Sequence, residues 1–471
     1  MRRILLVEPG YRNKYPPLGL MKISSYHKLA GDEVHFVKGC KASFREKTWD
    51  RIYISSLFTF FWSETMRTIR YYLKAVRSSE DVVVGGVMAT LLGTDIRKET
   101  GVKVVPGLLD RPGVLDAGSP TVIDELIPDY QILESIDYQY GVKDAYIAYA
   151  TRGCPNRCKF CAVHKIEPSF RHFCPLRRQV QGIEDVYGSK QHLILLDNNV
   201  LASRSFGRII HDICTLGFER GAKLNGRMRC ADFNQGVDAR RLSDRKMALL
   251  AETAIRPLRI AFDHISMKDL YVSRIRLAAK HGLLNLSNYV LYNYTDTPAD
   301  FYKRLRINCE LNEELGTKIY SFPMKYIPLT AKNRRYVGPN WNRKLIRGVQ
   351  CILLATRGMV SPRLEFFEAA FGRSPEEFHT IALMPNEYII HRRFYENNGA
   401  KDWTELFASL TKSQLRLLFD IHADGRITEA DFKRTKSPRF RRLLEHYIEA
   451  DRIEAKRRTA VGNPVIAGAG N

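Results

Sequence analysis

The chain carries the stretch Tyr149-Ala-Thr-Arg-Gly-Cys154-Pro-Asn-Arg-Cys158-Lys-Phe160-Cys161, in which three cysteines have the spacing C-x3-C-x2-C. An apolar run, Ala145 to Ala150, leads into this stretch and predicts a buried strand. Gly153 and Pro155 predict that the cysteines lie in a loop. Closely spaced cysteine thiolates are the usual ligands of iron–sulfur clusters. The loop is therefore a candidate cluster site, with Cys154, Cys158 and Cys161 as ligands.

The number of cysteines in the loop separates the kinds of metal site. Four thiolates would close every iron of a four-iron cluster, so three leave one iron open. Structural zinc also requires four ligands, usually as two separated pairs. Two alternatives remain: a zinc site that takes His164 as its fourth ligand, or buried cysteines without metal. We favour the cluster because the triad follows a strand end, where barrel proteins build their sites.

The cysteine motif, with the aromatic Phe160 directly before its last cysteine, resembles the radical S-adenosylmethionine enzymes. The resemblance implies that the three cysteines ligate a [4Fe-4S] cluster and that S-adenosylmethionine binds the open iron through its amino and carboxylate groups. It also implies one-electron cleavage to methionine and a 5′-deoxyadenosyl radical, which abstracts hydrogen from a substrate. A one-electron reductant such as flavodoxin or ferredoxin is then an expected partner.

The composition is that of a globular protein. With 471 residues, 45% hydrophobic and 11% aromatic, the chain is long enough for two or three domains. Its nine cysteines lack regular pairing outside the triad, which favours a reducing, cytoplasmic setting. We find no apolar run long enough to span a bilayer and expect no membrane insertion.

The charge balance is strongly basic. The chain has 74 Lys and Arg residues against 51 Asp and Glu, a formal net charge of +23. A surface of this sign attracts polyanions, so nucleic acid, or a substrate carried on it, is a candidate partner.

Residues 1 to 110 alternate strand and helix patterns, which predicts a Rossmann-like, flavodoxin-like parallel sheet domain. We expect strands at Ile4–Val7, Val34–Val37, Arg51–Leu57, Val82–Gly86 and Val102–Val105, with helices at Leu18–Leu29 and Glu64–Val76.

This first domain resembles the cobalamin-binding-type domain that precedes the barrel in one branch of the radical enzymes. The resemblance rests on Pro16-Pro17-Leu18-Gly19-Leu20 and on Val82-Val-Val-Gly85-Gly86-Val-Met-Ala-Thr90. Two departures from that branch concern the cofactor. No D-x-H-x-x-G motif follows the first strand, and Met88 stands where relatives often have histidine. The sequence therefore leaves cobalamin binding open.

Residues 111 to 144 are predicted as a connector, and the strand–helix alternation resumes over residues 145 to 330. Six such units match the partial (β/α)6 TIM-type barrel of the radical enzymes. Its expected strands are Ala145–Ala150, His192–Leu196, Lys223–Arg229, Leu258–Phe262, Leu286–Tyr292 and Lys318–Tyr326, and its helices are Phe206–Leu216, Asp244–Ala251, Asp269–Lys280 and Ala299–Leu315.

Polar residues follow several of these strands, at the barrel face where sites are built. We predict that they hold S-adenosylmethionine and part of the substrate; asparagine and aspartate also end strands because they favour turns and helix caps. The candidates are Asp197, Asn198, Asn199, Asn234, Gln235, Asp263 and Asn293, with Phe160 packed on the cluster or on adenine. Arg240 and Arg241 could bind a carboxylate, or form an exposed basic turn.

A basic segment, Ala331 to Arg347, opens a mainly helical region that we predict over residues 331 to 458, followed by a disordered tail over 459 to 471. The segment has no acidic residue and could contact phosphates and stack on bases. It could equally fold over the barrel mouth. Its candidate nucleic-acid-binding residues are Arg334, Arg335, Tyr336, Trp341 and Arg343.

The function predicted from these patterns is a radical S-adenosylmethionine enzyme whose substrate is nucleic acid or derived from nucleotides. One alternative is a cobalamin-dependent methyltransferase or rearrangement enzyme acting on a small molecule or peptide. The other is a non-enzymatic, zinc-stabilised nucleic-acid-binding protein.

Overall fold

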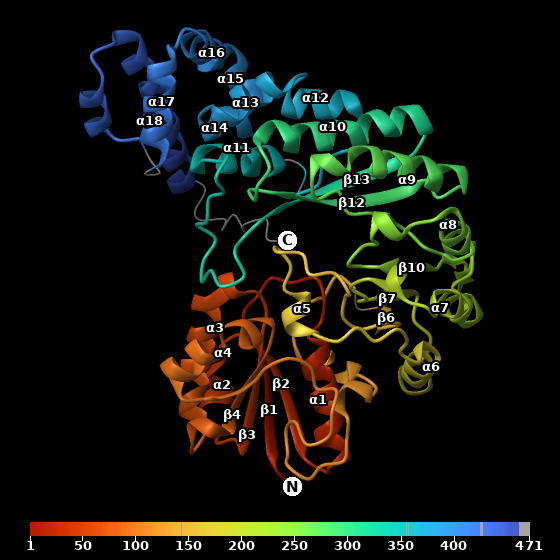
Figure 1. Ribbon diagram of the computed structural model, residues 1–471. Coiled ribbons are helices and arrows are strands. Elements are labelled where there is room, and N and C mark those ends of the chain that lie inside the picture. The colour runs from red at the N-terminus through yellow and green to blue at the C-terminus, as the bar shows by residue number, and fades with distance from the viewer. Residues whose placement is uncertain (143, 355, 357, 424–426, 461–471) are drawn as a thin grey trace. The chain divides into compact units, whose positions relative to one another are not determined.

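The computed structural model describes residues 1–142, 144–354, 356, 358–423 and 427–460 (Figure 1). Two compact units divide the chain: Met1–Arg259 with Ile327–Tyr336, and Ile260–Tyr326 with Val337–Asn471. The boundary between the units therefore falls inside the range that the sequence assigned to one barrel. Nearly all of the predicted tail, residues 461–471, lies outside the described residues.

The N-terminal sheet of the first unit has five parallel strands in the order β2-β1-β3-β4-β5. This is the flavodoxin-like order, as predicted, and the direction of winding reverses between β1 and β3. Ile4, Leu5, Leu6 and Val7 of the inner strand β1 are fully buried because helices cover both faces of such a sheet. The strands are β1 (Arg3–Glu8), β2 (Glu33–Lys38), β3 (Arg51–Ser56), β4 (Val82–Gly86) and β5 (Lys103–Val105).

One helix of this domain, α4, follows β4 without a loop and was not predicted. Gly86 has φ +102, and a Cβ there would lie 2.2 Å from the Ser56 carbonyl oxygen, so only glycine allows this tight turn. The Ser56 hydroxyl accepts from the Ala89 N–H at 3.0 Å and so satisfies a free donor of the first helical turn. The helices are α1 (Leu18–Leu29), α2 (Ala42–Arg45), α3 (Trp62–Tyr72) and α4 (Val87–Thr100).

A second parallel sheet in the first unit has the order β10-β7-β6. The predicted strand Lys223–Arg229 is wrong. Asn225 and Gly226, with φ of 50 and 74, turn the chain into a short antiparallel hairpin, an Asn-Gly signal that takes precedence over the apolar pattern. The elements here are β6 (Ala145–Ala148), α5 (Val163–Ile166), α6 (Leu176–Tyr187), β7 (His192–Leu195), α7 (Phe206–Ile213), β8 (Lys223–Leu224), β9 (Arg227–Met228), β10 (Cys230–Phe233), α8 (Asp244–Ala251) and β11 (Leu258–Arg259).

The second unit begins with α9 (Lys268–Lys280), β12 (Asn285–Tyr292), α10 (Pro298–Leu315) and β13 (Lys318–Lys325). Strands β12 and β13 pair in parallel over their whole length. Helix α10 starts with a capping box, in which the Thr297 hydroxyl and the Asp300 carboxylate each accept the other residue's N–H at 3.1 Å. Gly316, in the left-handed conformation, ends the helix.

The remainder of the second unit is helical, as predicted, around a core that includes Trp341, Phe378, Trp403 and Phe440. No helix in the described residues is long and apolar enough to cross a membrane. The helices are α11 (Arg343–Leu354), α12 (Leu364–Phe371), α13 (Pro375–Leu383), α14 (Asn386–Ile390), α15 (Arg392–Tyr395), α16 (Lys401–Ala408), α17 (Lys412–Ala423) and α18 (Pro438–Ala460).

Candidate iron–sulfur site

The cysteine loop leaves β6 and ends where α5 begins, and α5 packs against α4 of the N-terminal sheet domain. Its three cysteines are half-buried and form no disulfide. Gly153, just before Cys154, has φ +73, and a Cβ there would lie 2.4 Å from the Ser169 carbonyl oxygen. The loop path therefore depends on glycine at this position.

Asp197, the first polar residue after β7, holds the start of the cysteine loop. Its carboxylate accepts from the Ala150 N–H at 3.0 Å, from the Thr151 hydroxyl at 2.6 Å and from the Thr151 N–H. The side chain is buried, and burial raises the pKa of Asp197 to about 6. All of these contacts go to the cysteine loop, and contact of Asp197 with S-adenosylmethionine stays a prediction.

Glu167 closes the loop from its other end. Its carboxylate accepts from the Gly153 N–H and from Asn198 Nδ2 at 3.2 Å, and it pairs with buried Arg152 at 3.1 Å. Arg152 also pairs with Asp124 of the connector at 3.3 Å. Burial opposes the charge of Asp124, but Arg152 and Lys22 hold its pKa below the usual value. The loop is thus tied both to β7 and to the connector.

A third set of contacts reaches the cysteine sulfur atoms. Asn199 Nδ2 lies 3.5 Å from Cys154 Sγ and 3.3 Å from the Asp238 carboxylate. The same carboxylate accepts from Asn156 Nδ2 at 2.9 Å. It also accepts from Arg240 in bidentate fashion, at 2.8 and 2.9 Å, and Arg240 donates further to Cys158. The arginine predicted to bind a carboxylate therefore binds one of the chain's own.

The donor set fits an iron–sulfur cluster better than a single metal ion. Among the residues that the structure describes, no group of three His, Cys, Asp or Glu side chains is arranged to hold one ion. His164 Nδ1 is buried without a hydrogen-bond partner and joins no such group. Cysteines of a four-iron cluster each bind a different iron, and N–H donors to their sulfurs are characteristic of cluster sites. Nearby Cys174 is buried, which raises its pKa to about 11 and disfavours the thiolate that a ligand requires.

The remaining candidates of the first unit lie after β10. Asn234 is buried and accepts from the Tyr15 hydroxyl, which belongs to the loop after β1. Gln235 is exposed, and Phe160 of the cysteine loop is half-buried. The contact between Tyr15 and Asn234 brings the carboxyl end of the first sheet to the carboxyl end of the second.

Asp263 and Asn293 belong to the second unit. The Asp263 carbonyl oxygen accepts from buried Arg304 at 3.0 Å. Asn293 is fully buried, accepts from the Gly338 N–H at 2.7 Å and donates to the Tyr326 carbonyl at 3.1 Å. The side chain thus holds the following loop against β12 and β13, and its role in cofactor binding stays a prediction.

The basic segment contributes residues to both units, and in each unit some of its side chains contact other protein residues. In the first unit Arg334 lies over the Phe60 ring at 4.1 Å, and Lys332 lies over Trp62 at 3.8 Å and pairs with Asp95 at 2.9 Å. In the second unit Trp341 is 6% exposed and its indole N–H donates to the Asp296 carbonyl at 3.1 Å. Trp341 is therefore a buried residue of the second unit, and its stacking on a base stays a prediction.

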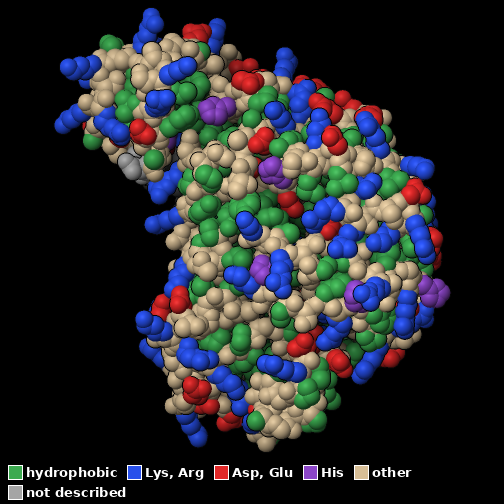
Figure 2. All heavy atoms as spheres, viewed as in Figure 1, with side chains coloured by type: hydrophobic (Ala, Val, Ile, Leu, Met, Phe, Trp, Pro, Cys, Tyr) green, Lys and Arg blue, Asp and Glu red, His purple; other side chains and the backbone are tan. Residues whose placement is uncertain are grey.

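Arg335 and Arg343 are exposed, and Tyr336 is half-buried. Lys and Arg side chains are spread over the visible face of the molecule, with acidic side chains between them (Figure 2). That face presents no single basic patch.

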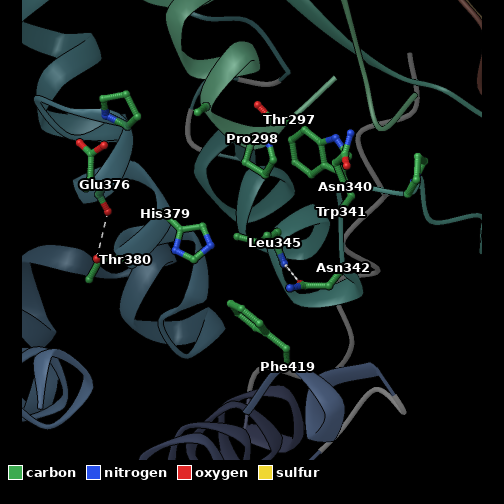
Figure 3. Close-up of a pocket in the computed structure, with 13 residues that line it drawn as sticks. Thr297, Pro298, Asn340, Trp341, Asn342, Leu345, Glu376, His379, Thr380 and Phe419 are labelled. Atoms are coloured by element: carbon green, nitrogen blue, oxygen red, sulfur yellow. Dashed lines mark hydrogen bonds between the residues drawn. The ribbon is translucent and has the colours of Figure 1, made fainter. Parts of the chain in front are cut away.

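An open pocket of about 690 Å³ lies in the second unit, between the starts of α10, α11 and α13 and the helix α17. Trp341 and Pro298 form one wall, and His379 and Phe419 approach from the other side (Figure 3). The rings of His379 and Phe419 meet edge to face at 5.9 Å, and burial lowers the pKa of His379. The Trp341 ring thus lines this open pocket and also packs in the core.

Sequence reasoning missed the residues that support the cysteine loop, namely Thr151, Arg152, Asn156, Glu167 and Asp238. Asn156 could have been noticed, because it lies between two of the cysteines. Asp238 was obscured because the strand was placed at Lys223–Arg229 instead of Cys230–Phe233, which put Asp238 far from a strand end.

Comparison with solved structures shows that the fold is similar to that of a solved radical S-adenosylmethionine methyltransferase. Neither a protein-family model nor a curated protein sequence matches the chain. One similar structure is TsrM from Kitasatospora setae, with tryptophan substrate and an S-adenosylmethionine analogue bound. The TM-score is 0.52 at 13% identity, over 98% of this chain and 100% of that one. The cobalamin-dependent enzyme OxsB also matches, with TM-score 0.45 and 13% identity, over 100% of this chain and 82% of that one. The predicted resemblance is confirmed for the fold, including the N-terminal sheet domain.

Proposed function

We propose that the chain is a radical S-adenosylmethionine enzyme whose [4Fe-4S] cluster is held by Cys154, Cys158 and Cys161. The observation that carries the proposal is the cysteine loop itself: three half-buried thiols after a parallel strand, with side-chain donors directed at two of their sulfurs. When bound, the cluster would supply the electron that cleaves S-adenosylmethionine. The electron would come from a one-electron carrier such as flavodoxin or ferredoxin.

The chain's own residues would position this chemistry. Asp197 and Glu167 hold the start of the loop, just before Cys154, by accepting hydrogen bonds from the N–H groups of Ala150, Thr151 and Gly153. Among the predicted contacts with S-adenosylmethionine, Gln235 is exposed and Phe160 is half-buried, which leaves both side chains accessible to a ligand. The polar residues after the strands stay proposed contacts beside them. The buried position of Arg152, between Asp124 and Glu167, keeps the charges beneath the loop paired.

The test is anaerobic reconstitution with iron and sulfide, followed by reduction and an assay for 5′-deoxyadenosine. We expect S-adenosylmethionine cleavage by the wild type and none by Cys158→Ala. Cys230→Ala is the matched control, because Cys230 is also half-buried but lies outside the motif; it should retain cluster and activity. A wild type that folds, binds iron and leaves S-adenosylmethionine intact would overturn the proposal.

Methyl transfer assisted by cobalamin is the second candidate, favoured by the N-terminal sheet. Ligands of this strand order bind at the carboxyl ends of β1 and β3, where the winding reverses. Ser55 Oγ, near the end of β3, is buried without a hydrogen-bond partner and so offers a polar contact to a bound group. Residues 9 to 17 contain no histidine, so a cobalt ligand from this loop would not be an imidazole.

Reconstitution with hydroxocobalamin tests the second candidate. Cobalamin should remain bound through gel filtration, and Ser55→Ala should weaken its binding, while Ser63→Ala on the exposed face of α3 should not. Wild-type protein that leaves the column without cobalamin absorption would exclude the cofactor.

Nucleic acid, or a substrate derived from nucleotides, remains a proposed partner on the strength of the net charge of +23. Arg334, Arg335 and Arg343 are the exposed arginines of the predicted contact segment, and Arg334 also lies over the Phe60 ring. Retention on immobilised RNA that declines with salt would support this partner, and its absence at low salt would oppose it.

A further inference from the structure

Two side-chain donors reach the sulfur atoms of proposed cluster ligands, and both are anchored on one carboxylate. Asn199 donates to Cys154 Sγ at 3.5 Å, and Arg240 donates to Cys158. Asp238 accepts from Asn199 at 3.3 Å and from Arg240 at 2.8 and 2.9 Å. The donors come from different segments, one after β7 and one after β10, so the shared carboxylate sets their relative positions.

The orientation of the Asn199 amide is fixed by chemistry. Burial disfavours the charge of Asp238, but hydrogen bonds from Arg240 and Asn156 hold its pKa below the usual value, so it is ionised at neutral pH. An ionised carboxylate only accepts hydrogen bonds, so the amide must present its NH2 group to Asp238. The same NH2 group faces Cys154 Sγ, while Asn199 Oδ1 is buried without a partner.

We propose that Asp238 is a positioning residue that holds Asn199 and Arg240 as donors to the Cys154 and Cys158 sulfurs, and that these donors raise the reduction potential of the cluster. The inference rests on the proposed function. One-electron reduction, with the electron supplied by a carrier protein, adds one negative charge to the cluster and its thiolates. Donors to the sulfurs stabilise the reduced form more than the oxidised form, and the donor on Arg240 is charged.

The experiment is a potentiometric titration of the reconstituted wild type and its variants, with dithionite and mediator dyes, monitored by electron paramagnetic resonance. We expect Asn199→Ala and Arg240→Gln each to lower the equilibrium constant for reduction about tenfold, equivalent to about 59 mV more negative for one electron. Asp238→Ala removes the acceptor that anchors both donors, and the loss of its negative charge alone would make reduction easier; a more negative potential in this variant would therefore come from the lost donors.

Arg241→Gln is the matched control. Arg241 is the neighbouring arginine, with a guanidinium 3.8 Å from the Asp238 carboxylate, and its loss removes the same charge from the same turn. Its potential should move much less than that of Arg240→Gln, because only the change in charge acts. A shift as large as that of Arg240→Gln would mean that overall charge, not the hydrogen bond to sulfur, sets the potential, and would overturn the proposal.

Iron content is measured first, because it distinguishes a failure of the proposed function from a failure of the role proposed for Asp238. A wild type without a cluster overturns the proposed function together with this inference. With the cluster present at full iron content, unchanged or more positive potentials in Asn199→Ala and Arg240→Gln overturn the inference alone. If Asn199→Ala loses iron, its potential cannot be compared with that of the wild type. The comparison of Arg240→Gln with the charge-conserving Arg240→Lys then tests the proposal, which requires a smaller shift of the reduction potential for lysine than for glutamine.

Discussion

At the scale of single residues, Gly153 decides whether the cysteine loop can follow its path. Replacement by alanine combines a positive φ with a Cβ that would lie 2.4 Å from the Ser169 carbonyl oxygen. We expect Gly153→Ala to lower the free energy of unfolding by about 1–3 kcal/mol and to reduce iron uptake. Urea unfolding and iron analysis of the reconstituted protein measure the two effects.

Gly31→Ala is the control for Gly153→Ala. Gly31 has φ +77, close to that of Gly153, but a Cβ there meets nothing within 4 Å. It should show a smaller loss of stability, from the backbone conformation alone, and normal iron uptake. Equal effects of the two substitutions would mean that the contact with Ser169 is unimportant.

Asp197 predicts a pH dependence of stability. Its pKa in the folded state is about 6, above the ordinary 3.8, because the carboxyl group is buried. The folded state therefore binds this proton more tightly than the unfolded state. The resulting stabilisation is fully present below about pH 4 and is lost as the pH rises through 6, a change of roughly 3 kcal/mol for this group.

Comparison of the wild type with Asp197→Asn isolates that contribution. Asparagine does not titrate, so the variant should lack the decline in unfolding free energy between pH 4 and pH 7 that Asp197 gives the wild type. Urea unfolding at both pH values measures the difference. Parallel pH profiles for the two proteins would show that Asp197 is charged in the folded state throughout this range.

At the scale of elements, local sequence patterns predicted a helix or strand correctly where no turn signal or distant contact opposed them. The helix Leu18–Leu29 and the strand Val82–Gly86 lie where the sequence put them. The strand at Lys223–Arg229 was wrong because the Asn225-Gly226 turn divides that run into a hairpin. Helix α4 was missed because its start depends on a contact with Ser56, a residue of another strand that no local pattern reports.

The polar residues after the strands show that local sequence patterns also predict only part of the site. Their position at the carboxyl ends of strands was predictable from the pattern of the sequence. Their partners were not, because Asp197, Asn198 and Asn199 all reach residues of the cysteine loop or its supports, about 30 to 47 positions away along the chain. Asn293 lies in the second unit and became a structural residue through contacts with a later loop. Hydrogen-bond partners at such separations follow from the fold alone.

The loop before α11 gives a prediction at this scale. Trp341 packs against Tyr292 and Phe301, with ring centroids 5.4 and 5.9 Å apart, and is 6% exposed. We expect Trp341→Ala to lower the free energy of unfolding by about 3–5 kcal/mol. Exposed Arg343→Ala should change it by less than about 0.5 kcal/mol.

Both residues were predicted to meet nucleic acid, so this pair distinguishes a core residue from a surface residue. Urea unfolding of the two variants is the measurement. A Trp341→Ala variant as stable as the wild type would show that the ring is available at the surface and would support its predicted role in base stacking.

At the scale of the whole molecule, the charge of +23 is an attribute of the entire surface more than of one segment. Lys and Arg side chains are distributed over the visible face (Figure 2), and Arg334 and Lys332 of the basic segment already lie on aromatic rings. A polyanion bound by such a surface responds to the number of phosphates neutralised. We therefore expect binding of single-stranded RNA to depend on how many exposed arginines are removed, wherever they lie.

Two double variants test this expectation. Arg335→Ala with Arg343→Ala removes exposed arginines of the basic segment, and Arg77→Ala with Arg97→Ala removes exposed arginines of the N-terminal sheet domain. If the whole surface contributes, each pair should reduce the slope of log K against log salt by the same amount, at most about 1.4 for two phosphate contacts on a single strand. A larger loss for the first pair, with the second pair unchanged, would locate the RNA site at the basic segment after all, through Arg335 and Arg343 and without Trp341.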